Sequence, residues 1–169
     1  MKKLNIVLIG MPSSGKTTVG EPLSKNLSMK FIDTDKIILD NEKRPLRDIV
    51  NNDGLQRFLE IQENTILGLD LENHVVSTGG SVVYNSNAME HLKENSIVVY
   101  LKLGLEEIEK RITAERRFAR NTEQSFSDLY NERTPLYEKY ADVIVDCSNK
   151  GVQPIVEEIR EIYERTVKR

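Results

Sequence analysis

The stretch GMPSSGKTT, residues 10–18, constrains the fold of this chain more than any other. It directly follows the apolar run LNIVLI at residues 4–9, and a helical pattern begins near Lys16. A strand, a glycine-rich loop and a helix form the context that a phosphate-binding loop of the form G-x-x-x-x-G-K-[ST] requires. The stretch therefore predicts a phosphate site between a strand and a helix.

The residue types of this loop indicate which phosphate compound binds there. Gly10 and Gly15 permit backbone angles that a Cβ would block, so that successive N–H groups can point at phosphate oxygens. Lys16 would reach the β- and γ-phosphates, the Thr17 hydroxyl would ligate Mg²⁺, and the helix N-terminus adds positive potential. The alternative is an ordinary strand-to-helix turn that contains two glycines. We predict a nucleoside triphosphate with magnesium, contacted by Gly10, Ser13, Ser14, Gly15, Lys16, Thr17 and Thr18.

Composition narrows the class of protein. The 169 residues suffice for one well-cored domain, and a formal net charge of −3 gives no reason to expect nucleic acid or an anionic membrane as a partner. No apolar run approaches the ~20 residues of a membrane span, and we expect no signal peptide. A single cysteine, Cys147, fits a reducing cytoplasm, where we expect the protein to work as a monomer. His74, His91 and Cys147 lie too far apart in sequence to suggest a zinc site, and we read them as structural or surface residues.

Strand-like and helical patterns alternate along the chain. Further strand-like runs lie at 30–32, 74–77, 97–101 and 143–145, and helical patterns at 16–27, 55–71, 85–93, 105–111, 127–140 and 152–167. Such alternation predicts a parallel sheet with helices on both faces, and near-continuous apolar strands agree with it. We expect one domain over residues 1–169.

The polar segment 113–125 interrupts this order. It carries Arg116, Arg117 and Arg120 and few apolar residues. A long polar segment in a compact domain is either disordered or functional, often as a lid. We expect at least one of these arginines, with Arg117 favoured, to reach the transferring phosphate; the alternative is a flexible loop that stays polar for solubility.

Three further stretches are candidates for this site, because ligands of open α/β sheets bind beyond the carboxyl ends of strands. Asp33-Thr34-Asp35 places two carboxylates there: one could hold magnesium through water, and the other could accept a hydroxyl proton, although an aspartate that only caps the next helix is the alternative. Thr78-Gly79-Gly80-Ser81 permits close backbone approach to a ligand, or simply forms a tight turn. Arg133 precedes Pro135, and nothing local distinguishes it from an exposed helical arginine.

Together, the phosphate loop, Asp33-Thr34-Asp35, Thr78-Gly79-Gly80 and Arg133-x-Pro135-Leu136-Tyr137 resemble shikimate kinases in order and spacing over nearly the whole chain. The resemblance implies a three-layer α/β/α fold with a five-stranded parallel sheet of the nucleoside-monophosphate-kinase type. It implies phosphoryl transfer from ATP to the shikimate 3-hydroxyl, a step of aromatic amino acid biosynthesis, and a substrate-binding helical region at about 33–72. For the acceptor, it implies that Asp35 contacts the reacting hydroxyl, that Gly79 and Gly80 line the substrate pocket and that Arg133 binds the carboxylate. For the nucleotide, it implies that Asp33 lies near magnesium and that Arg111 and the loop 148–154 with Pro154 contact adenine. The lid would be the segment 113–125.

Two positions depart from the family pattern. The family carries Phe-Arg-x-x-Glu, whose arginine is a second contact to the carboxylate, but this chain reads Phe58-Leu59-Glu60-Ile61-Gln62. Arg57 and Glu60 keep the Arg-x-x-Glu spacing two positions earlier, which makes Arg57 a candidate substitute, although two helical positions turn a side chain by ~200°. Ser81 stands where a third glycine is expected.

Three functions remain open from the sequence. The first is a shikimate kinase, and the second is a kinase for another small hydroxyl compound, such as a sugar acid like gluconate, which Leu59 and Ser81 favour. The third is a regulatory module that binds ATP without turnover. A module of that kind has no need of the second carboxylate, so Lys16, Thr17, Asp33 and Asp35 argue against it. ATP consumption with and without a panel of acceptors separates the three.

Overall fold

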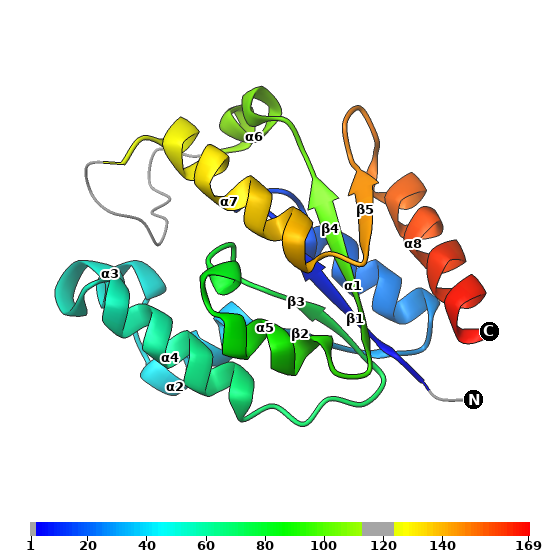
Figure 1. Cartoon of the computed structure of the whole chain (residues 1–169), viewed down its shortest axis with the longest axis horizontal. Helices are drawn as coiled ribbons and strands as arrows, with labels where there is room; N and C mark the ends of the chain where they lie inside the picture. The colour runs from blue at the N-terminus through cyan, green and yellow to red at the C-terminus, as the bar shows by residue number, and fades with distance from the viewer. Residues whose placement is uncertain (1–2, 113–123) are drawn as a thin grey trace.

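A parallel β-sheet forms the centre of the molecule (Figure 1). The computed structural model describes residues 3–112 and 124–169. In this part of the chain the sheet has five strands in the order β2-β3-β1-β4-β5, and every pairing is parallel. The predicted five-stranded parallel sheet is thereby confirmed. The strands are β1 (Asn5–Ile9), β2 (Lys30–Asp33), β3 (His74–Ser77), β4 (Ser96–Lys102) and β5 (Val143–Asp146).

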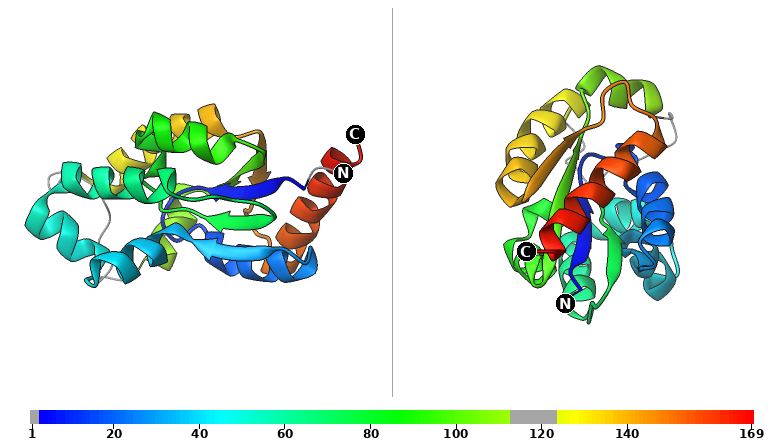
Figure 2. Two further views of the ribbon diagram at one scale, coloured as in Figure 1. Left: turned by 90° about the horizontal axis from the view of Figure 1, so that it is seen from below. Right: turned by 90° about the vertical axis from the view of Figure 1, so that its right-hand side faces the viewer.

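Helices cover both faces of the sheet, as Figure 2 shows. Helices α1 and α8 pack together on one face, whereas α5 and α7 lie on the other. Helices α2, α3 and α4 pack on one another beyond one end of the strands. The helices are α1 (Lys16–Asn26), α2 (Thr34–Glu42), α3 (Leu46–Asp53), α4 (Leu55–Leu67), α5 (Ser86–Lys93), α6 (Leu105–Arg111), α7 (Phe126–Tyr140) and α8 (Val152–Val167), with a 3₁₀ turn η1 (Val82–Tyr84).

The central strands are apolar because both of their faces are covered. All five residues of β1 are buried, and so are the five central residues of β4. The registers place Asp33 of β2 beside Ser77 of β3, and Ser77 beside Leu8 of β1. The carboxyl ends of three strands therefore meet at one edge, where their following loops converge.

A second, smaller core lies outside the sheet. It consists of Ile38, Ile49, Phe58 and Ile61, from α2, α3 and α4. Leu46, Val50 and Leu59 pack against it from the rim. These helices thus hold one another through their own apolar contacts, and they form a wall that faces the carboxyl ends of the strands. Among the described residues, no helix is both long enough and apolar enough to cross a bilayer.

Candidate active site

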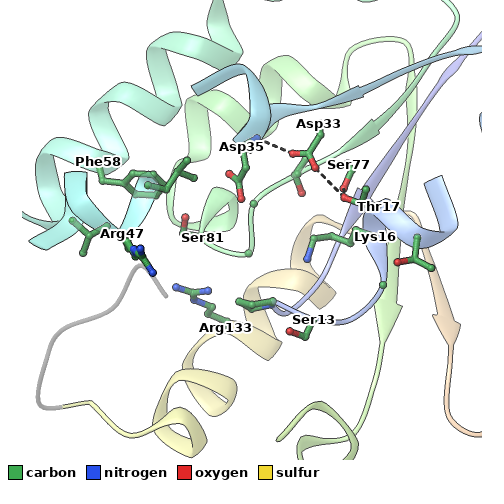
Figure 3. Close-up of a pocket in the computed structure, with 18 residues that line it drawn as sticks. Ser13, Lys16, Thr17, Asp33, Asp35, Arg47, Phe58, Ser77, Ser81 and Arg133 are labelled. Carbon is green, nitrogen blue, oxygen red and sulfur yellow. Dashed lines mark hydrogen bonds between the residues drawn. The ribbon is translucent and has the colours of Figure 1, made fainter. Parts of the chain in front are cut away.

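A cavity of about 360 Å³ lies where the strand ends face the second core (Figure 3). Its size suits a small-molecule ligand. The phosphate loop forms one side of it, and α3, α4 and α7 form the other. Most of the predicted site residues line this cavity, which is bounded by Pro12, Ser13, Gly15, Lys16, Thr17, Thr18, Asp33, Asp35, Leu46, Arg47, Val50, Phe58, Ser77, Thr78, Gly79, Gly80, Ser81 and Arg133.

Lys16 lies at the base of the phosphate loop. Its Nζ donates hydrogen bonds of 2.8 Å to the carbonyls of Gly10 and Met11, and only 8% of the residue is exposed. Gly15 adopts a φ of +96°, which L side chains rarely adopt, and thereby allows the chain to turn into α1. A buried ammonium beside the N-terminus of α1 concentrates positive charge at this side of the cavity. The loop is therefore built to receive an anion.

The two carboxylate oxygens of Asp33 accept hydrogen bonds from different parts of the chain. Its Oδ1 accepts hydrogen bonds from the backbone N–H of Asp35 and Lys36 and so caps α2. Its Oδ2 accepts a 2.9 Å hydrogen bond from Thr17 Oγ1, which also lies 3.1 Å from Ser77 Oγ. The capping alternative thus accounts for one Asp33 oxygen, while the other joins β2 to the phosphate loop.

Asp35 does not cap the helix but lines the cavity. It lies against the turn after β3, because a Cβ on Gly79 would come within 2.5 Å of Asp35 Oδ1 and 3.0 Å of Gln62 Nε2. Gln62 is fully buried, and its Oε1 accepts a hydrogen bond from Ser81. The absence of a side chain at Gly79 therefore sets how closely this carboxylate approaches the strand ends.

Replacing Gly79 by alanine is expected to displace the Asp35 carboxylate, because buried Gln62 blocks the other side. Misplacing a reacting group by about 1 Å can lower turnover by about a hundredfold, and we expect a loss of kcat of that order. Steady-state kinetics measure it. Gly68→Ala is the matched control, because its Cβ meets only ordinary contacts of 3.5–3.6 Å and its φ is −80°. Wild-type turnover in Gly79→Ala would show that the position of Asp35 is not critical.

Arg133 projects from α7 into the cavity and is only 1% exposed. Its Nε donates a 3.1 Å hydrogen bond to Tyr84 Oη, and its guanidinium lies 5.1 Å from the centroid of the Tyr84 ring. Tyr84 Oη in turn donates to Glu132. Arg133 is therefore not the exposed helical arginine that its local sequence suggested, but a buried cation with a fixed orientation.

Tyr137, one turn after Arg133, supports the cavity from behind its wall, a role that its place in the family motif did not indicate. Its hydroxyl donates a 2.6 Å hydrogen bond to the Gly80 carbonyl. Burial raises the pKa of this phenol well above its ordinary value, so the hydroxyl remains a donor. Residues four positions apart share one helix face, so the Arg133–Tyr137 spacing was the available signal. Tyr137 therefore holds the Gly79–Gly80 turn from the same helix that carries Arg133.

A second cavity adjoins the other side of the phosphate loop. Arg111 lines it and donates a 3.4 Å hydrogen bond from Nη1 to the Ser13 carbonyl. The buried Cys147 thiol also lines it, and burial raises its pKa to about 11, which keeps the thiol protonated and unreactive at neutral pH. Pro154 is exposed in the first turn of α8 and does not line this cavity; its neighbours Val152 and Ile155 do. Helix α8 begins at Val152, as its helical pattern predicted, so the loop that the resemblance placed at 148–154 ends before Pro154.

The structure does not bring Arg57 to the first cavity. Arg57 is exposed on α4 and pairs with Glu60 at 3.3 Å. It points away from the direction of position 59, in agreement with the turn of ~200° between the two positions. Leu59 packs against the second core. The cavity instead receives Arg47 from α3, which no local sequence signal distinguished from the other arginines. The predicted phosphate contact Arg117 and the other lid arginines lie outside the described residues.

This chain is similar to shikimate kinases along nearly its whole length. A family model described as shikimate kinase matches residues 12–164. The shikimate kinase of Caldanaerobacter subterraneus subsp. tengcongensis is 33% identical over 164 residues, which cover 94% of this chain and 95% of that protein.

Solved structures show the same similarity in three dimensions. The structure of shikimate kinase from Acinetobacter baumannii in complex with shikimate aligns with a TM-score of 0.87 at 27% identity, over 97% of this chain and 94% of that one. Thymidylate kinase from Candida albicans aligns with a TM-score of 0.65 at 17% identity, over 98% of this chain and 92% of that one. The second match extends the likeness in fold alone to a nucleoside-monophosphate kinase.

Proposed function

Because the chain belongs to the shikimate kinase family, we propose that it transfers the γ-phosphate of ATP to the 3-hydroxyl of shikimate. One observation carries the proposal: Lys16 of the phosphate loop, the Asp35 carboxylate and the Arg133 guanidinium line the same cavity. Such a cavity can hold a phosphate group, a hydroxyl group and a carboxylate at once.

In this proposal Asp35 orients the acceptor hydroxyl and receives its proton. The acceptor oxygen forms a bond to the γ-phosphorus, and the bond from that phosphorus to the oxygen bridging the β- and γ-phosphates breaks. Lys16 stabilises the negative charge on the phosphate oxygens, and the adjoining second cavity beside Arg111 accommodates the base of the nucleotide. Positioning and charge stabilisation supply most of the rate enhancement in such transfers.

The residues around Thr17 fit a magnesium ion. The Thr17 hydroxyl donates a hydrogen bond to Asp33, and its oxygen keeps lone pairs with which it can ligate a cation. Mg²⁺ commonly keeps several waters and takes one or two protein oxygens besides substrate phosphates, so Thr17 with Asp33 behind it is a sufficient set. Bound magnesium neutralises phosphate charge. Within residues 3–112 and 124–169, no cluster of three or more His, Cys, Asp and Glu side chains could hold a metal by itself.

A panel of acceptors tests the proposed function. Shikimate, gluconate and a no-acceptor control are each offered with ATP and Mg²⁺, and ADP release is measured. We expect shikimate to stimulate ADP release and its phosphate ester to form, with gluconate at the background rate. Turnover with gluconate alone would assign another acceptor, and ATP binding without turnover on any acceptor would indicate a regulatory module.

A further inference from the structure

Two arginines from different helices lie near each other at one end of the cavity. Arg133 comes from α7 and Arg47 from α3, and Figure 3 shows both side chains directed into the cavity. The Nη1 atom of Arg133 would lie 3.0 Å from a Cβ on Gly80, which places it beside the turn after β3. The two carboxylates that line the cavity lie on the opposite side of it: Asp33 ends β2, and Asp35 is in the first turn of α2. This end is therefore suited to an anionic group of the ligand.

Helix α4 supplies no cation to this end. Phe58 is its residue in the cavity wall, Leu59 packs against the second core, and buried Gln62 is bonded to Ser81. Arg57 turns outward to Glu60. In the described part of the chain, the second guanidinium at this end of the cavity thus comes from the neighbouring helix α3.

The packing of α3 places Arg47 toward the cavity. Leu46 and Val50, on either side of it in sequence, line the cavity and also pack against the second core. Arg44, two residues before α3, forms an ion pair with Asp53, the last residue of the helix. These contacts set the register of α3, so the direction of Arg47 follows from the packing of its own helix.

The contact that Arg47 makes with the described residues is weak. Its Nε lies 3.9 Å from Asp48 Oδ1, and the two side chains are 54% and 45% exposed. Exposed ion pairs of this kind contribute little to stability, so a ligand carboxylate can replace the Asp48 contact. A guanidinium can bind a carboxylate through two parallel hydrogen bonds, which suits a fixed acceptor geometry.

We propose that Arg47 and Arg133 together bind the carboxylate of the acceptor, with Arg47 supplying the second guanidinium that α4 lacks. Leu46, Val50 and Phe58 form the apolar wall beside it, against which a carbon ring can pack. The inference rests on the proposed function only in requiring an acceptor that carries a carboxylate. It makes Arg47 a residue that determines substrate specificity.

Arg47→Ala tests the proposal, and Arg57→Ala is the matched control because that side chain is also 54% exposed and ion-paired on the adjacent helix. Loss of one charge-assisted contact weakens binding by about tenfold to a hundredfold, so we expect Kd and KM for shikimate to rise by that factor in Arg47→Ala. The kcat and the KM for ATP should stay near wild type, Arg47→Lys should lie between, and Arg57→Ala should behave as wild type. Calorimetric binding of shikimate gives Kd independently of turnover, and thermal melting checks the fold.

Shikimate methyl ester, which lacks the negative charge of the carboxylate, measures how much that charge contributes to binding. Wild type should bind the ester much more weakly than shikimate, whereas Arg47→Ala should discriminate less between the two. An unchanged Kd in Arg47→Ala, or an equal loss in Arg57→Ala, would overturn the role of Arg47. If wild type neither binds nor phosphorylates shikimate, the proposed function fails, and the same variants are measured with whichever carboxylate acceptor is active. If wild type binds no carboxylate acceptor, both proposals fail.

Discussion

Lys16→Ala is expected to lower kcat on the order of 10²–10³-fold, the effect of removing one group that stabilises charge in a transition state. Lys16 Nζ contacts two loop carbonyls and the cavity rather than the apolar core. Its ammonium is therefore available to phosphate oxygens as negative charge moves toward the leaving group. ADP release under saturating ATP and acceptor measures the loss.

The control for this prediction is Lys25→Ala, at the exposed end of the same helix α1. It removes an equal charge far from the loop, so turnover should stay at the wild-type level. Both variants should melt cooperatively, because neither side chain belongs to the hydrophobic core. Near-normal turnover in Lys16→Ala would remove the loop lysine from the mechanism.

Asp35→Asn is expected to lower kcat by roughly 10²–10⁴-fold, the range for loss of a general base. The amide keeps the shape of the carboxylate but cannot accept the hydroxyl proton in the same way. ATP binding should persist, because the phosphate loop and the second cavity do not include Asp35. Nucleotide titration and steady-state kinetics on the same preparation separate the two effects.

The structure allows this prediction to be distinguished from the alternative that Asp35 only caps a helix. Asp33, not Asp35, caps α2, so Asp35→Asn should leave the melting temperature nearly unchanged. Asp40→Asn, an exposed position on the same helix, controls for the loss of a charge. Full turnover in Asp35→Asn would show that Asp35 is not the proton acceptor.

The sequence alone determined the parts of the protein that depend on neighbouring residues. The predicted strand before GMPSSGKTT and the helix after it are present as β1 and α1, because an apolar strand, a glycine-rich turn and a helix start are all local patterns. The other four predicted strands are also present, with ends shifted by at most one residue. Alternation of strands and helices was sufficient to predict the parallel sheet.

Only the tertiary structure decided which side chains share the cavity. Local sequence does not distinguish Arg47, Arg57 and Arg133. In the structure, Arg57 is exposed on α4, Arg133 is buried on α7 and Arg47 enters the cavity from α3. Contacts far apart in the chain make the difference: Tyr84 orients Arg133, and the second core sets the register of α3. The spacing of residues in a helix predicts which of them share a face, but the partner against which that face packs comes from elsewhere in the chain. For that reason the phosphate site could be predicted from local sequence, whereas the second contact to the acceptor carboxylate could not.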